Sequence, residues 1–156
     1  MSRNLLNVKA EELWPGYERV FTIMEYYDGP RRGIANYLGE PHLYECIFAE
    51  TKDSYSDLFQ LTHLDGETFQ LAMEDWGIWQ RFEIAFHTGK TDIRTHPALP
   101  HEVSRHAELE RILDRTLVTD PQKAVTKLGR FEVLGEPSLA KGILRPLQVK
   151  WTDPQP

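Results

Sequence analysis

The sequence predicts an α+β fold: an antiparallel curled sheet or small barrel-like sheet of about six strands, with two helices inserted between strand four and the C-terminal strands. Three observations lead to this prediction. Short segments rich in β-branched and aromatic residues alternate with turn residues as far as Leu64, a spacing typical of a curled sheet or small barrel. A helical period replaces the alternation from Asp65 to Leu117. Strand-like alternation then returns after Pro121.

The segments before Leu64 have the composition of four strands. Turn-forming sequences at Asp28-Gly29-Pro30 and Gly39-Glu40-Pro41, and a polar loop from Glu50 to Asp57, separate them. The predicted strands are Glu18 to Tyr27, Gly33 to Leu38, His42 to Ala49 and Leu58 to Leu64. Because the connections are short, we expect an antiparallel meander.

The segment that begins at Asp65 is an aromatic amphipathic helix with the strongest helical period in the chain. Asp65 is a good N-cap, because its carboxylate can accept hydrogen bonds from backbone N–H groups of the first turn. Apolar residues line two sides of this helix: Phe69, Ala72, Met73, Trp76 and Trp79 on one, and Leu71, Ile78, Phe82 and Ala85 on the other. We therefore predict either that the helix lies between the sheet and the second helix, or that its Leu71 side forms a homodimer interface.

The rest of the chain predicts a second helix and two strands. The helix is expected from about His101 to Leu117, and the strands at Val125 to Leu134 and Leu144 to Trp151. Pro146 makes the last segment an edge strand or delays its start to Leu147. We expect the alternating residues Leu147, Val149 and Trp151 to share a buried face, which would make this strand structural.

Length and charge limit the organisation and the partners. The 156 residues predict a single domain over 1–156, with residues 1–16 as an N-terminal arm and residues 152–156 as a frayed tail. The formal net charge of −6 argues against nucleic acid and an anionic membrane as partners, because affinity for phosphate comes mainly from Lys and Arg. No stretch approaches the ~18 uninterrupted apolar residues of a membrane-spanning helix.

The sequence carries no strong signature of catalysis or of a cofactor. It contains no Gly-rich phosphate loop and no GxSxG, HExxH or CxxC motif. The histidines are not spaced to chelate one ion from a regular helix, so we expect no metal and no cofactor. Cys46 is the one cysteine, which excludes an intrachain disulfide and favours a cytoplasmic location. We expect it to be a small core residue, because nothing local would activate its thiol.

Four side chains are candidates for acid–base chemistry. Glu83 and His87 are four residues apart, which places them on one face of the first helix, where a carboxylate bonded to an imidazole can act as a general base. Asp75 on the same helix is expected to be partly buried. Glu45 lies between two apolar residues of a strand and would line a cavity if it faced inward.

Four further residues are candidates for binding. Arg31 and Arg32 are adjacent in a predicted turn, where both would be free to contact a carboxylate or a phosphate. Tyr26 and Tyr44 belong to a region rich in tyrosine, a residue type that suits a protein or small-molecule contact as well as a core.

Two functional hypotheses follow. The first is a small cytosolic protein- or ligand-binding module without catalytic activity. The alternative is a small hydrolase or isomerase that uses a carboxylate/histidine acid–base pair in a pocket between helix and sheet. Geometry discriminates between them: candidate groups that converge within hydrogen-bond distance in a concave pocket favour the enzyme, and groups that point separately into solvent argue against it.

Overall fold

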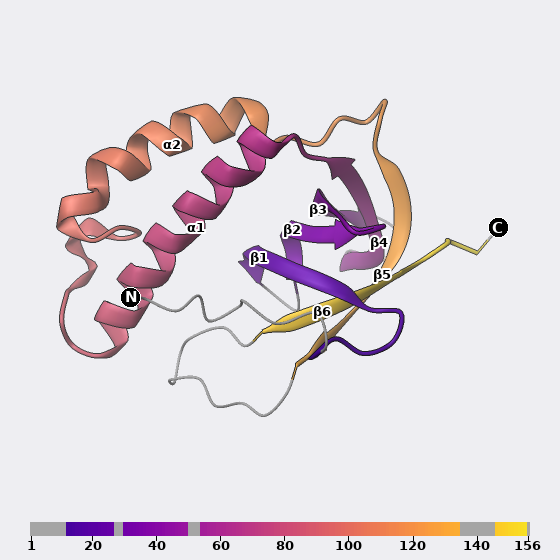
Figure 1. The fold of residues 1–156 in the computed structure, drawn as a ribbon, viewed down its shortest axis with the longest axis horizontal. Coiled ribbons are helices and arrows are strands. Elements are labelled where there is room, and N and C mark those ends of the chain that lie inside the picture. Colours follow the sequence, from indigo (N-terminus) through magenta and orange to yellow (C-terminus); the bar gives the residue numbers. More distant parts are fainter. Residues whose placement is uncertain (1–11, 27–29, 50–53, 135–145, 156) are drawn as a thin grey trace.

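A computed structural model describes residues 12–26, 30–49, 54–134 and 146–155 of the chain. It confirms the predicted fold class: the strands are antiparallel and close into a small barrel, and two long helices lie against it (Figure 1). Neighbouring strands follow chain order, and the last strand closes the barrel against the first. The strands are β1 (Glu18–Tyr26), β2 (Pro30–Tyr37), β3 (Glu40–Ala49), β4 (Ser54–His63), β5 (Val125–Val133) and β6 (Leu147–Thr152).

Three strands begin earlier than their composition indicates, and the third of the chain starts at Glu40 instead of His42. The second starts at Pro30, so Arg31 and Arg32 belong to β2 and not to a turn. The fourth starts at Ser54, within the stretch that its polar residues mark as a loop. The cause is pairing across the sheet: Ser54 lies opposite Ala49, and a shift in register between Cys46 and Phe48 accommodates the extra length. Backbone hydrogen bonds to β3 therefore override the local composition.

The helices confirm the predicted cap and the predicted layering. Asp65 caps α1 (Gly66–His87), accepting a 2.7 Å hydrogen bond from the backbone N–H of Thr68. The short helices η3 (Ile93–Thr95) and η4 (Pro100–Glu102) lead to α2 (Val103–Thr116), so the first turn predicted for the second helix is a 3₁₀ turn. α1 lies between the barrel and α2 (Figure 1), which is the first of the two predicted ways to cover it.

One hydrophobic cluster fills the barrel. Its centre is a group of aromatic rings contributed by several strands, and Trp76 of α1 belongs to the same cluster. The rings, whose centroids lie 5.3–6.2 Å apart, are Tyr44, Phe59, Phe131 and Trp151. Gly129 leaves the room they need: a Cβ atom there would lie 2.5 Å from the Trp151 ring. The barrel interior is therefore a packed core.

A second cluster lies between the outer surface of the barrel and the helices. It joins Ile34 and Leu43 of the sheet to Ile78 of α1 and Leu109 of α2. Ile78 and Phe82 are almost fully buried. This is the side of α1 that the sequence left open as a dimer interface. In the structure α2 covers it at Ile78, and the segment between the helices covers it at Phe82, whose ring contacts His96.

β6 docks as the sequence predicts, with one difference. Leu147 and Val149 are buried, whereas Trp151 is only partly buried and packs against the same cluster. Its indole Nε1–H donates a 2.9 Å hydrogen bond to the carbonyl of Asn36. The difference is Gln148, which lies on the alternate face and is also fully buried. Its Oε1 accepts a hydrogen bond from the backbone N–H of Trp14. The segment that precedes β1 thus covers the outer face of β6 at this point.

Candidate functional site

The candidate residue Asp75 lies in the wall of a small pocket between α1, α2 and the first two strands. The pocket has a volume of about 60 Å³. Its lining is mostly apolar and comprises Thr22, Met24, Ile34, Ala72, Asp75, Trp76, Leu113 and Leu117. Water competes little for hydrogen bonds to a carboxylate in a mostly apolar wall. Such a carboxylate therefore favours a hydrogen-bond donor as its neighbour.

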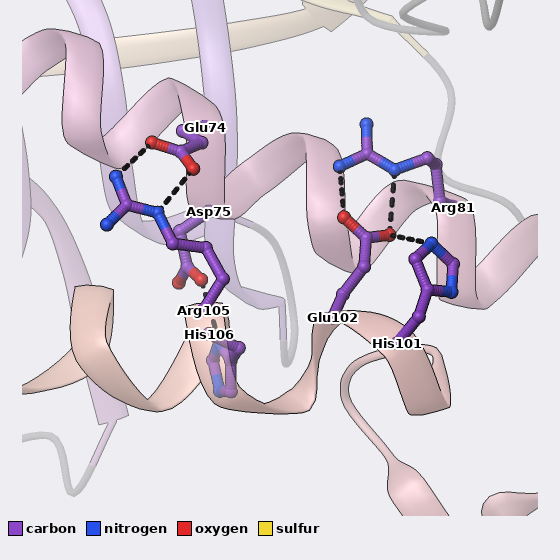
Figure 2. A network of polar contacts seen from close by, with 7 residues as sticks. All are labelled: Glu74, Asp75, Arg81, His101, Glu102, Arg105 and His106. Atoms are coloured by element: carbon purple, nitrogen blue, oxygen red, sulfur yellow. Dashed lines mark hydrogen bonds and ion pairs between the residues drawn. The ribbon is translucent and has the colours of Figure 1, made fainter.

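Asp75 is held by a histidine from the other helix. Its Oδ1 lies 2.6 Å from Nδ1 of His106 (Figure 2). The second ring nitrogen of His106 lies 3.4 Å from Oε2 of Glu110. Both members of the pair are mostly buried. The imidazole is therefore placed between two carboxylates. The sequence offered no sign of this pair, because its members are 31 residues apart and are brought together only by the packing of α1 on α2.

Two bidentate ion pairs fix the position of α2 on α1. Arg105 donates to both oxygens of Glu74 at 2.6 and 2.7 Å, and Arg81 donates to both oxygens of Glu102 at 2.9 and 2.6 Å (Figure 2). The hydrogen bonds from these guanidinium groups lower the pKa of Glu74 and of Glu102. Because Glu74 and Arg105 are the chain neighbours of Asp75 and His106, the first ion pair holds the candidate pair in register.

Trp76, which also lines the pocket, has an unused hydrogen-bond donor. Its side chain is more than nine-tenths buried, and its indole Nε1–H has no hydrogen-bond partner among the residues that the structure describes. The ring stacks on Trp79 with a centroid distance of 4.7 Å. A buried N–H group without a partner is destabilising, which makes Trp76 a residue whose donor a ligand group can satisfy.

Glu45 and Arg32 form a separate polar cluster near the end of α2. Arg32 Nε lies 3.1 Å from Glu45 Oε2, and its Nη2 donates to the carbonyl of Leu117, one of the pocket residues. Thr119 donates to the other oxygen of Glu45 at 2.9 Å. Glu45 does not line the pocket. Its partners tie the end of α2 to the sheet, so both charged groups are already engaged within the protein.

The predicted pair of Glu83 and His87 forms, but away from the pocket. His87 Nε2 lies 3.2 Å from Glu83 Oε2, and the same carboxylate is 3.9 Å from His96. Glu83 follows Asp75 by eight residues, which is about 12 Å along the axis of α1. Of the four acid–base candidates, only Asp75 lines the pocket, so these groups do not converge on one site.

The remaining binding candidates lie inside the barrel or outside the described residues. Arg31 is buried, and its positive charge acts to lower the pKa of the Cys46 thiol. Tyr44 is fully buried, and its hydroxyl donates a 2.9 Å hydrogen bond to the carbonyl of Thr22. The side chain of Tyr26 lies outside the described residues. Burial raises the pKa of the Cys46 thiol, although the charge of Arg31 opposes this shift, and Sγ donates to the carbonyl of Ser56. A thiol held protonated is a poor nucleophile, in agreement with a core role.

The described residues show neither a metal site nor a membrane-spanning helix. Across the described ranges, no group of three or more His, Cys, Asp or Glu side chains is arranged to hold a metal ion. No helix in that part of the chain combines the length and the apolar character needed to cross a membrane. Comparison with known proteins finds no matching family model, curated protein or solved structure. Function therefore has to be inferred from the geometry of the pocket.

Proposed function

We propose that the chain is a small binding module without catalytic activity, whose ligand places a compact apolar group in the pocket between α1, α2 and the first two strands. The observation that carries the proposal is Asp75, a carboxylate fixed by His106 in an otherwise apolar wall. If one water-sized group occupies ~10–15 Å³ by this measure, the pocket holds roughly four to six non-hydrogen atoms. That size suits the end of a ligand or one side chain.

The polar groups of the pocket define the chemistry of this ligand group. Asp75 Oδ2 has no hydrogen-bond partner in the described residues and can accept a bond, while Trp76 can donate one. A short alkyl chain that ends in an amine or an alcohol satisfies Asp75, and the apolar side chains enclose its carbon atoms. The net charge of −6 favours the amine, which is a cation at neutral pH.

The alternative function, a small hydrolase or isomerase, is favoured by one observation. Asp75 and His106 are a carboxylate/histidine pair at a pocket between helix and sheet, with the 2.6 Å separation that proton transfer requires. Against it, both nitrogens of His106 face carboxylates, which leaves no ring nitrogen for a substrate. The hydroxyl of Thr22 already accepts a hydrogen bond from the backbone N–H of Ile34. These contacts support binding over catalysis.

The test uses isobutylamine and isobutanol as probes. Their binding is monitored through the indole Nε1–H resonance of Trp76 in a ¹⁵N-correlated NMR spectrum. We expect a saturable shift of this resonance, assigned from its loss in Trp76→Phe. Ala72→Leu fills the pocket and should abolish the shift. Ala85→Leu adds the same atoms to α1 at a residue that does not line the pocket, and should leave the shift unchanged.

The charge of the ligand is tested by Asp75→Asn, which keeps the shape of the side chain. We expect this variant to lose its preference for isobutylamine over isobutanol. Equal shifts in the Ala72→Leu variant and the unaltered protein would contradict the binding site. Saturable hydrolysis of p-nitrophenyl acetate that His106→Gln abolishes would favour the enzyme instead.

We further propose a cytoplasmic location, supported by the free thiol of Cys46, and partners that are neither nucleic acid nor membrane, supported by the acidic net charge. We also keep the homodimer as a proposal. The Leu71 side of α1 contributes little to such an interface, because Ile78 and Phe82 on that side are buried within the chain. Sedimentation at micromolar concentration distinguishes a dimer from a monomer of 18.2 kDa.

A further inference from the structure

The strands β4 and β5 pair along only part of their length. Their ladder joins Leu61 with Val125 and ends at Leu58 and Leu128. Beyond that point β4 continues to Ser54 by pairing with β3, and β5 continues to Val133 by pairing with β6. Within the described residues, the edge of β5 from Gly129 to Val133 that faces β4 therefore has no strand partner.

A groove opens where these two strands diverge. Its volume is about 550 Å³, within the usual range of ~300–1,000 Å³ for binding clefts. Asp57 of β4 lines one wall, residues 128–131 of β5 line the floor, and Lys150 and Thr152 of β6 line the other wall.

The wall formed by β5 and β6 is basic. Arg130 and Lys150 lie directly opposite each other in the ladder between these strands, and like charges in that arrangement repel. Arg130 donates to Glu132 at 2.8 Å, whereas the ammonium group of Lys150 has no ion-pair or hydrogen-bond partner in the described part of the chain. An anionic group beside Lys150 would relieve this repulsion. Asp57, on the β4 wall, disfavours a second anion on its own side.

We propose that this groove binds an extended peptide that adds a strand to the free edge of β5 and places a carboxylate side chain on the face of the sheet that carries Arg130 and Lys150. An unpaired edge presents a row of N–H and C=O groups that another strand satisfies in full. A second side chain of the peptide, two residues from the acidic one, packs on Leu128, which lies on the same face of β5 as Arg130. The charge pattern sets the specificity, because the acidic residue of the peptide must lie opposite Arg130, on the face that also carries Lys150, and away from Asp57.

The test uses acetyl-Thr-Val-Glu-Val-Thr-amide and the same peptide with Lys in place of Glu. Binding is measured by titration in NMR, and strand formation by amide hydrogen exchange over residues 129–133. We expect the Glu peptide to bind at least about tenfold more tightly than the Lys peptide and to protect those amides that face β4. A Glu peptide N-methylated at alternate residues, which removes its backbone donors on one edge, should lose binding.

Two variants separate the groove from general electrostatics. Lys150→Gln should weaken the Glu peptide about fivefold, and Lys150→Glu should reverse the preference between the peptides. Lys123→Gln removes an exposed lysine outside the groove and should change neither affinity. Protection of the edge amides in the free protein, equal binding of the N-methylated peptide, or a dimer whose contact protects β5 would overturn the proposal. The last outcome would assign the groove to a second copy of the chain.

Discussion

Tyr44 can lie inside the barrel because of the residue opposite it. In the ladder between β2 and β3 it faces Gly33, and its hydroxyl reaches across to the carbonyl of Thr22. A Cβ atom on Gly33 would lie 2.2 Å from that carbonyl oxygen and 2.6 Å from the tyrosine hydroxyl. The alternation of β3 puts Tyr44 and Cys46 on one face, but only the register shows that this face is inside. The sequence therefore left a contact role and a core role both open for Tyr44, and the structure makes it a core residue.

Replacing Gly33 by alanine tests this packing. We expect Gly33→Ala to lower the free energy of unfolding by about 1–3 kcal/mol, because the methyl group collides with backbone and displaces the tyrosine hydroxyl. Gly66→Ala is the control, since a Cβ atom there meets nothing within 4 Å and alanine suits a helix better than glycine. The measurement is urea denaturation. Equal midpoints for Gly33→Ala and the unaltered protein would contradict the close packing.

The two helices show which interactions a sequence reveals and which it conceals. The N-cap at Asp65 and the pair of Glu83 with His87 are local, and both form as predicted. The pair of Asp75 with His106 depends on how α2 lies along α1, which no short-range pattern encodes. The sequence thus predicted the pair of Glu83 with His87 at the end of α1. Of the pair at the pocket it indicated Asp75 but not His106.

The ion pair between Arg81 and Glu102 should make stability depend on pH. Arg81 lowers the pKa of Glu102 from its ordinary 4.5, so the folded protein binds fewer protons there than the unfolded chain. The contribution is therefore complete above pH 4.5 and is lost as the pH falls through the lower folded pKa. We expect Glu102→Gln to destabilise by about 1 kcal/mol at pH 7, a modest value because Arg81 is partly exposed, and by progressively less in acid.

Urea denaturation of this variant over a series of pH values measures the effect. Asp114→Asn is the control, since it removes one exposed negative charge from α2 without breaking an ion pair found in the described residues. Its effect should not follow the same acid profile. A destabilisation by Glu102→Gln that is as large at pH 3 as at pH 7 would show that the charge of Glu102 is not the cause.

At the scale of the whole molecule, the order of the elements follows from periodicity and the closure of the barrel does not. Alternation and helical period are local properties, so they correctly predicted strands, then two helices, then strands. Closure depends on β6 meeting β1, whose residues are more than a hundred positions away. The strand pairing of residues 54–57 and the groove beside β5 are likewise set by registers between strands, which the composition of one strand does not contain.

Because β6 closes the barrel, removing it should be far more damaging than its length indicates. It pairs with β1 on one side and β5 on the other, and it brings Val149 and Trp151 into the core. Burial of Trp151 alone contributes on the order of 2–3 kcal/mol by area, out of a typical margin of about 5–15 kcal/mol. Truncation before Leu147 should therefore abolish soluble folded protein or lower Tm by several degrees.

The matched truncation removes only the residues that follow β6, beginning at Asp153. Within the described residues, it breaks an exposed ion pair between Asp153 and Lys127, and surface pairs of this kind contribute about 0–1 kcal/mol. Thermal unfolding of the two truncated proteins separates closure of the barrel from simple removal of the chain end. If truncation before Leu147 left the melting curve unchanged, β6 would not be structural, and Trp151 would instead have to be considered a residue that binds a partner.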